Sequence, residues 1–323
     1  MIHIFPPPAT GAGAGNDAAG LSGAVWVDLV SPTAGEAATV ERAFGVRLPS
    51  EADLSEIEAT SRLRVTGDAL VMSAPLNAGT STDRWTMAPT GFILSERVCI
   101  TIRFAELGAF SAVAERVRGG AECTPPTIFV ALLEEVVDRT ADLLERAAEE
   151  IAEASQSIFM DDRTHRKRLA RDTNRLRNMM VRVGRATDRM SRVRYTFLSI
   201  GRMAAFTSDR CPAEIGEEIH ERLDSIRKDI ASLDEFETSL ANRAQLLQDA
   251  ATGFISIEQN DVVKVLTVAS VAGVPPVLVV GIYGMNFHDM PELSWTWGYP
   301  FALALVVLST VLPLIWFRWR DWI

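Results

Sequence analysis

The chain has 323 residues, 48% of them hydrophobic, and a formal net charge of −10 at pH 7. This acidic balance disfavours nucleic acid as a partner and is compatible with binding cations. The cysteines Cys99, Cys123 and Cys211 are too widely separated for a thiolate metal site, and their odd number fits a reducing compartment.

The N-terminal part contains two segments. Residues 1–22, rich in proline, glycine and alanine, lack the basic and apolar regions of a signal peptide and are predicted to be a flexible N-terminus. Residues 23–125 are predicted to form a cytoplasmic α+β domain. Its first strand is expected at Ala24–Val30, where hydrophobic residues alternate, and a helix follows with Ser31 as its cap and Pro32 in its first turn.

Two β-hairpins are predicted in the same domain. The sequence RLRVTGDALVMSAPL favours a hairpin that turns at residues 66–68, and GFILSERVCITIRF favours one that turns at residues 95–97.

Long helices are predicted after the α+β domain. Residues 126–211 are expected to form a helical hairpin in which an acidic block precedes the basic block Arg163–Arg194, and a second acidic block follows. Antiparallel packing of helices of opposite charge is the simplest explanation. Binding of nucleic acid or lipid by the basic block is the alternative.

Residues 212–261 are predicted to form a long stalk helix. Apolar residues recur there at steps of three or four, which predicts a packing seam. Its members are Ile215, Ile219, Leu223, Ile226, Ile230, Leu233, Phe236, Leu240, Ala244, Leu247, Ala251 and Phe254. If this helix continues into the next apolar segment, its length is on the order of 110 Å.

Two apolar runs close the chain, Val262–Ile282 and Tyr299–Phe317, and each is long enough to cross a bilayer. Two core helices of a soluble protein are the alternative. Lys264, Arg318 and Arg320 flank the outer ends of the runs, so the positive-inside rule predicts that both termini are cytoplasmic. The expected segments are a first transmembrane helix at 262–283, a periplasmic loop at 284–298, a second transmembrane helix at 299–317 and a basic C-terminus at 318–323.

The first span carries a stripe of uncharged residues at helical spacing. Its members are Asn260, Val263, Leu266, Ser270, Val274, Val277, Gly281 and Gly284. Two spans cannot enclose a pore, so a conducting protein requires a ring of copies. The stripe would let a dication keep its water, and rings of Leu266, Val274 and Val277 could gate by dewetting. Ordinary helix packing is the alternative.

The stretch YGMNF follows the first span. Gly284 permits the backbone to leave helical geometry, and a ring of Asn286 side chains would offer neutral amide oxygens to a hydrated cation. Asp289 and Glu292 would raise the local cation concentration. A turn that merely ends a helix is the alternative.

Several motifs together resemble the CorA family of divalent metal-ion channels. These are NDVVKVLTVAS, GIYGMNFHDMPEL and WGYPFAL in the membrane part, a basic aromatic C-terminus, and WVDLVSPT with the two hairpins in the N-terminal part. The resemblance implies a homopentameric funnel in the bacterial inner membrane that conducts Mg²⁺, often also Co²⁺ or Ni²⁺. Mg²⁺ would be both the transported and the regulatory ion.

The resemblance also implies roles for single residues. Gly284, Met285 and Asn286 would form the selectivity ring, supported by Tyr283. Other positions would line or gate the pore, namely Asn260, Leu266, Ser270, Val274 and Val277; some members carry threonine at the position of Val277. A regulatory carboxylate on the stalk falls on Asp249, for which a solvated surface role is the alternative.

Two other functions are compatible with the sequence, and enzymatic activity is not expected. One alternative is the related zinc-transporting branch, possibly proton-coupled, although the membrane segments offer only His288 as a soft ligand. The other is a membrane-anchored cation sensor or scaffold without transport. An enzyme is not expected, because no P-loop, GxSxG or HExxH motif occurs in a credible context and the histidines are scattered.

Overall fold

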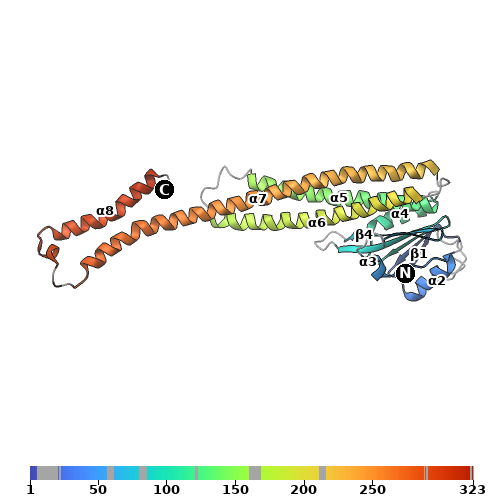
Figure 1. Cartoon of the computed structure of the whole chain (residues 1–323), viewed down its shortest axis with the longest axis horizontal. Helices are drawn as coiled ribbons and strands as arrows, with labels where there is room; N and C mark the ends of the chain where they lie inside the picture. The colour runs from blue at the N-terminus through green and yellow to red at the C-terminus, as the bar shows by residue number, and fades with distance from the viewer. Residues whose placement is uncertain are drawn as a thin grey trace. The chain divides into compact units, whose positions relative to one another are not determined.

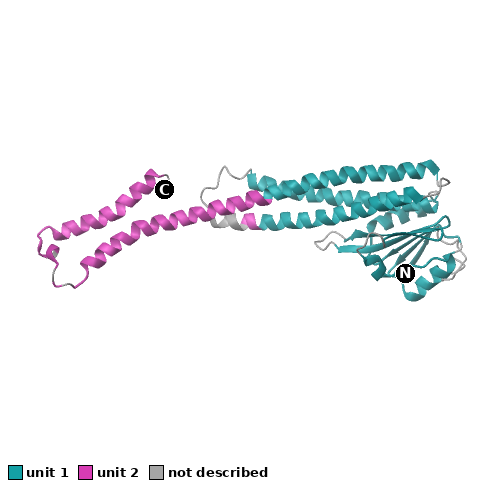
Figure 2. Ribbon diagram, viewed as in Figure 1, with its two compact units in different colours: residues 1–163, 178–247 teal, residues 164–177, 248–323 magenta. Residues whose placement is uncertain are grey.

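The computed structural model divides the chain into two compact units (Figure 2). Unit 1 comprises residues 1–163 and 178–247, and unit 2 comprises residues 164–177 and 248–323. The structure describes the whole chain except residues 6–20, 22, 57–61, 80–85, 121–122, 160–168, 211–215, 287, 289, 321 and 323.

Unit 1 contains a six-stranded sheet with the order β1-β2-β6-β5-β4-β3. Only the β2–β6 pairing is parallel among the described strands. The strands are β1 (Ile2–Phe5), β2 (Trp26–Val30), β3 (Leu63–Thr66), β4 (Ala69–Ala78), β5 (Thr86–Leu94) and β6 (Cys99–Arg103). The predicted first strand and both hairpins are confirmed. Gly67, with a left-handed φ of +60°, makes the first turn. In the second turn the Ser95 amide donates to the Val98 carbonyl at 3.1 Å.

The prediction of a flexible N-terminus is wrong for residues 2–5. They form β1, which pairs antiparallel with β2 from Ile2 opposite Leu29 to Phe5 opposite Trp26. The Phe5 ring stacks on Trp26 with centroids 4.6 Å apart. A strand of only four residues beside a proline-rich and glycine-rich stretch gives little sequence signal, so its pairing with β2 had no local indication.

Short helices complete the α+β part. The helix α2 (Ala34–Phe44) is capped by Thr33 in a capping box with Glu36, not by Ser31 as predicted. Thr33 displaces Ser31 because its hydroxyl accepts from the Glu36 amide while the Glu36 carboxylate accepts from the Thr33 amide. Helix α3 (Glu51–Ser55) has the same device with Ser50 and Asp53, and α4 (Gly108–Arg118) follows β6.

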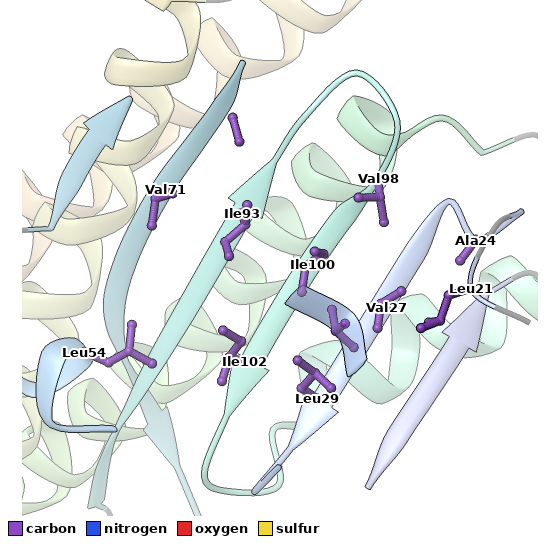
Figure 3. Close-up of a cluster of buried hydrophobic side chains, with 12 residues drawn as sticks. Leu21, Ala24, Val27, Leu29, Leu54, Val71, Ile93, Val98, Ile100 and Ile102 are labelled. Carbon is purple, nitrogen blue, oxygen red and sulfur yellow. The ribbon is translucent and has the colours of Figure 1, made fainter. Parts of the chain in front are cut away.

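The two faces of the sheet are both buried. Figure 3 shows Val27, Leu29, Ile93, Ile100 and Ile102 on one face, and Leu54 of α3 packs in the same cluster. The alternate residues of β5 and β6 point to the other face, where the Phe92 ring lies 6.0 Å from those of Phe110 in α4 and Phe129 in α5. Strict alternation therefore gives the sheet two apolar layers.

A buried polar network lies on the second face of the sheet. Arg103 donates to both carboxylate oxygens of Asp28, at 2.9 to 3.3 Å, and Thr101 donates to Asp28 at 2.7 Å. Trp26 donates its indole N–H to Thr101 at 3.0 Å. Because the Asp28 and Arg103 side chains are only 4% and 9% exposed, neither charge can be solvated if its partner is lost.

Three long helices extend unit 1: α5 (Pro125–Phe159), α6 (Leu169–Arg210) and α7 (Gly216–Tyr283) (Figure 1). The described part of the basic block on α6 pairs with acids of both neighbours. Arg182 and Arg189 bind Glu153 and Glu150 of α5. Arg194 binds Asp234 and Glu237 of α7, each at 3.1 Å. Packing of helices of opposite charge, as predicted, accounts for these arginines.

The predicted seam on α7 needs one correction. Leu223, Ile226 and Ala244 are buried as expected, but Phe236 and Phe254 are exposed. Glu237, only 4% exposed, takes the place predicted for Phe236 and receives the Arg194 ion pair. Burial raises the pKa of the Glu237 carboxyl, and Arg194 opposes that shift. A hydrophobicity pattern cannot find a seam position filled by a paired carboxylate.

Unit 2 contains the C-terminal part of α7, a 3₁₀ turn η3 (Pro291–Ser294) and α8 (Gly298–Trp319). The helices α7 and α8 each contain a segment long and apolar enough to cross a membrane, and only 6% of each such segment is buried. Core helices of a soluble protein would be mostly buried, so the transmembrane interpretation is the better one.

The buried Asp28–Arg103 pair yields a stability prediction. The change Asp28→Asn keeps the side-chain shape but leaves the Arg103 charge unpaired, and we expect it to lower the free energy of unfolding of unit 1 by about 3–5 kcal/mol. Urea denaturation of the detergent-solubilised chain, followed by circular dichroism, measures this loss. The matched control is Asp224→Asn, whose exposed pairs with Arg227 and Lys228 should contribute less than about 1 kcal/mol. Equal losses in the two variants would contradict the prediction.

Candidate ion pathway along the first membrane span

The stalk and the first span are one continuous helix. Helix α7 has 68 residues, which corresponds to about 100 Å at 1.5 Å per residue. It continues through Pro275 and Pro276, which have no backbone N–H to donate. The carbonyl groups of Val271 and Ala272 therefore lack the donor four residues ahead that a regular helix supplies.

One face of the span is partly covered within unit 2. The partly buried residues recur at helical spacing and include Val268, Ala272, Pro275, Pro276, Val279 and Tyr283. Helix α8 has a matching partly buried set, namely Ala302, Leu305, Val306, Ser309, Thr310 and Pro313, together with the buried Phe317. The two spans form a hairpin (Figure 2). Trp322, just after α8, lines a cavity together with six residues of α7, namely Ile257, Asn260, Asp261, Val263, Lys264 and Thr267. This covered face of α7 is the one turned toward α8.

The uncharged stripe predicted from the sequence lies on the opposite side of α7 from Leu266 to Gly284, whereas its first two members, Asn260 and Val263, line the cavity with Trp322. All eight of its members are exposed, with Leu266 at 66% and Val277 at 71%. At 3.6 residues per turn, Ser270 and Val274 lie nearly opposite Ala272 and Val279. Packing against α8 therefore does not explain the stripe from Leu266 to Gly284, and a single chain leaves that part exposed.

The stripe presents oxygen acceptors and apolar surface. The Ser270 hydroxyl donates to the Leu266 carbonyl at 2.9 Å, so its lone pairs remain available to water. Asn260 adds an amide at one end, and no Asp, Glu, Lys or Arg occurs between Lys264 and Asp289. Such a surface can contact the water shell of a cation but offers no charged ligand to replace it.

The span ends at Tyr283, and Gly284 forms the turn that follows. The Gly284 amide donates to the Val280 carbonyl at 2.9 Å, and the Met285 amide donates to the Ile282 carbonyl at 3.2 Å. A Cβ atom at residue 284 would lie 3.1 Å from the Val280 oxygen. Gly284 is absent from the glycines with positive φ, so its backbone conformation does not require glycine, and a side chain there would be crowded against the last helical turn. Met285 and Asn286 follow, both exposed.

The loop beyond the stretch Gly284–Asn286 is held against the start of α8. A side chain at Gly298 would clash with the Glu292 carbonyl oxygen, and the Trp295 and Phe301 rings lie 5.7 Å apart. Glu292 is exposed at the beginning of η3. Asp289, the other predicted carboxylate of this loop, lies outside the described residues.

The predicted regulatory residue Asp249 is exposed on α7. Nowhere in the described part of the chain do three His, Cys, Asp or Glu side chains gather closely enough to hold a metal ion. Among the described residues, Asp249 therefore belongs to no such group.

Sequence reasoning missed the role of the C-terminus. Trp322, together with Asn260 and Lys264, lines a cavity of ≈ 360 Å³ beside α7. The tryptophan and arginine residues at the end of the chain were used to orient the spans and as part of the family resemblance, but no cavity was predicted from them.

Comparisons with known proteins agree with this arrangement. Residues 22–319 match the model of a family described as CorA-like Mg²⁺ transporter protein. The magnesium transport protein CorA of Pasteurella multocida is 31% identical over 312 residues, which cover 95% of each chain. That of Wolinella succinogenes is 28% identical and covers 94% of this chain and 92% of its own.

The fold is also similar to solved structures. The complete CorA magnesium transporter of Methanocaldococcus jannaschii matches with a TM-score of 0.74 at 17% identity, covering 92% of this chain and 91% of its own. The full-length CmaX protein matches with a TM-score of 0.63 at 18% identity, covering 92% and 88%. The predicted fold, an α+β domain followed by long helices and two C-terminal spans, is confirmed.

Water along the exposed stripe can be tested with two neighbouring residues. Ser270 and Ala269 are both small and exposed, and as neighbours in α7 they lie at nearly the same depth of the span, but only Ser270 belongs to the stripe. We expect a membrane-impermeant thiosulfonate reagent to modify Ser270→Cys several times faster than Ala269→Cys, because the thiolate forms only in water. Intact-protein mass spectrometry of the chain in vesicles measures the modification.

The background for this test carries Cys123→Ser and Cys211→Ser. Cys99 is retained because it is fully buried, and burial raises the pKa of its thiol. Equal rates at residues 269 and 270 would show that the stripe has no preferential contact with water.

Proposed function

This chain belongs to the CorA family of Mg²⁺ transporters, and from that premise we propose that it forms a channel through which Mg²⁺ enters the cell. The observation that carries the proposal is the exposed, uncharged stripe of α7 that leads to Gly284, Met285 and Asn286. Co²⁺ and Ni²⁺, dications of similar hydration, are proposed as further permeant ions.

A ring of copies would complete the pathway. One α7 stripe can form only one side of a pore, so several copies must present it to a common axis. We propose a homopentamer in the inner membrane with both termini cytoplasmic. The exposure of the stripe and the partial covering of the opposite face by α8 support this arrangement, in which α8 would face lipid.

The proposed selectivity depends on hydration. Mg²⁺ releases its inner waters reluctantly, so a ring of neutral Asn286 amides would bind those waters and not the bare ion. The close approach of Gly284 to Val280 would fix the height of the ring, and Tyr283 would support it. Farther along the pore, Leu266, Val274 and Val277 would exclude water in the closed state.

The membrane potential would drive the ion inward. One charge gains about 2.3 kcal/mol per 100 mV, and a dication gains about twice that amount. Asp289 and Glu292 would concentrate cations at the outer mouth. We further propose that cytoplasmic Mg²⁺ bound at Asp249 between neighbouring copies closes the pore, which predicts slower uptake into vesicles preloaded with Mg²⁺ than into empty ones.

The uptake assay that tests the function uses the purified chain in sealed vesicles with a negative interior potential. We expect Mg²⁺ to enter without proton movement, because the pathway carries no Asp, Glu, Lys, Arg or His between Lys264 and His288 that could relay protons. Fluorescent indicators for Mg²⁺, Zn²⁺ and pH report the fluxes in parallel. Zn²⁺ uptake coupled to protons would assign the chain to zinc transport, and no flux of any ion would favour a sensor or scaffold.

The role of Asn286 has its own test. We expect Asn286→Ala to lower the initial rate of Mg²⁺ uptake about tenfold or more, because the amide oxygens that would contact the hydrated ion are removed. The control is Asn242→Ala, an exposed asparagine in unit 1 that should leave uptake unchanged. Full Mg²⁺ flux through the Asn286→Ala variant would exclude the assigned role.

A further inference from the structure

The C-terminal tail has a defined structure beyond the end of α8. The amide of Trp322 donates to the Phe317 carbonyl at 3.0 Å, and the amide of Arg320 donates to the Trp316 carbonyl at 3.1 Å. The Trp322 ring stacks on Phe317, with centroids 5.4 Å apart and planes inclined by 24°, and Phe317 itself is buried. These contacts fix the indole of Trp322 beside α7.

A cavity of ≈ 360 Å³ lies between this indole and α7. Its size is within the range of small-molecule sites, roughly 300–1,000 Å³. Ile257, Val263 and the Trp322 ring give it apolar walls, and Asn260 and Lys264 give it polar groups. The site is therefore amphipathic, with an aromatic wall and an ammonium group.

The cavity lies at the boundary of the membrane. Lys264 is near the start of the first span, and Trp322 follows the end of the second, so both are at headgroup depth. Arg318 and Arg320 lie just before Trp322 in the chain, and the Arg320 guanidinium stacks over Trp316 at 5.4 Å. Neither arginine forms an ion pair with a carboxylate that the structure describes.

One carboxylate competes for the charge in the cavity. Asp261 lies 3.0 Å from the Lys264 ammonium, but both side chains are about half exposed. Exposed pairs of this kind are weak, and an ammonium group has three donors, so Lys264 can also bind a phosphate oxygen. Arg318 and Arg320 add positive charge beside the cavity, and Asp321, between Arg320 and Trp322 in the sequence, adds a negative charge outside the described residues.

We propose that this cavity binds the headgroup of an anionic phospholipid. The lipid phosphate accepts from Lys264, the glycerol packs against the Trp322 indole, and the acyl chains lie beside the spans. Arg318 and Arg320 favour an anionic over a zwitterionic headgroup, with an enrichment of about fivefold for each cation near the surface. The proposal depends on the membrane position of α7 and α8 and not on ion conduction.

Quenching of tryptophan fluorescence by brominated lipids tests the site on the full chain. Vesicles of phosphatidylcholine with a minor fraction of phosphatidylglycerol carry bromine either on the anionic lipid or on an equal fraction of the zwitterionic one. The difference between the wild-type chain and Trp322→Phe gives the quenching of Trp322. We expect brominated phosphatidylglycerol to quench it several times more strongly than brominated phosphatidylcholine.

Three further variants locate the effect. Trp319, which is 83% exposed and does not line the cavity, gives the ordinary lipid contact through the same difference with Trp319→Phe. Lys264→Gln should reduce the preference at Trp322 toward that at Trp319, and Lys264→Arg should restore it.

Three outcomes would overturn the proposal. Equal quenching of Trp322 by the two lipids would show that the cavity does not select anionic headgroups. Quenching by neither lipid would show that protein, such as a neighbouring copy, fills it. Loss of the preference on addition of inorganic phosphate would show that the site binds a free anion. None of these readouts requires Mg²⁺ flux, so the result is independent of the proposed channel activity.

Discussion

The absence of water inside a bilayer is the constraint on which the membrane part of this chain depends. Hydrocarbon offers no partner to a backbone N–H or carbonyl group, so the crossing segments must be helices that satisfy their own hydrogen bonds. The same constraint excludes charge, and none of the residues from Val265 to Phe287 is Asp, Glu, Lys or Arg. A pathway for a dication must then be made of neutral groups, which leaves the ion's own water shell as its immediate surroundings.

Unit 1, in contrast to the uncharged membrane segment, contains many charged side chains that pair with one another. Arginines of α6 bind carboxylates of α5 and α7 along much of the described helix length. Exposed pairs of this kind contribute little stability individually, but their pattern disfavours any other arrangement of the three helices. The Asp28–Arg103 pair is different, because burial makes each of its charges dependent on the other.

Much of the fold could be predicted from local patterns. Both hairpins were predictable because Gly67 and the Ser95 turn interrupt alternating strands, and both spans because their apolar runs match the bilayer thickness. The errors arose where a distant partner decides the outcome. The strand β1 forms by pairing with β2, and Glu237 is buried because it pairs with Arg194. The position of Trp322 depends on its contacts with Phe317 and α7. The stripe from Asn260 to Gly284 was predictable from spacing alone, whereas the steric reason for Gly284 required the position of the Val280 carbonyl.

The two consecutive prolines of α7 have a mechanical consequence. A regular helix resists bending because hydrogen bonds join each turn to the next. Two consecutive bonds are missing here, because Pro275 and Pro276 have no N–H to donate to the carbonyl groups of Val271 and Ala272. The segment that contains Leu266 and the segment that contains Val277 are therefore joined by a compliant section. A bend at Pro275 and Pro276 would change the tilt of the segment that ends at Gly284 relative to the segment that contains Leu266. The two ends of the stripe could then move by different amounts, although one helix carries both.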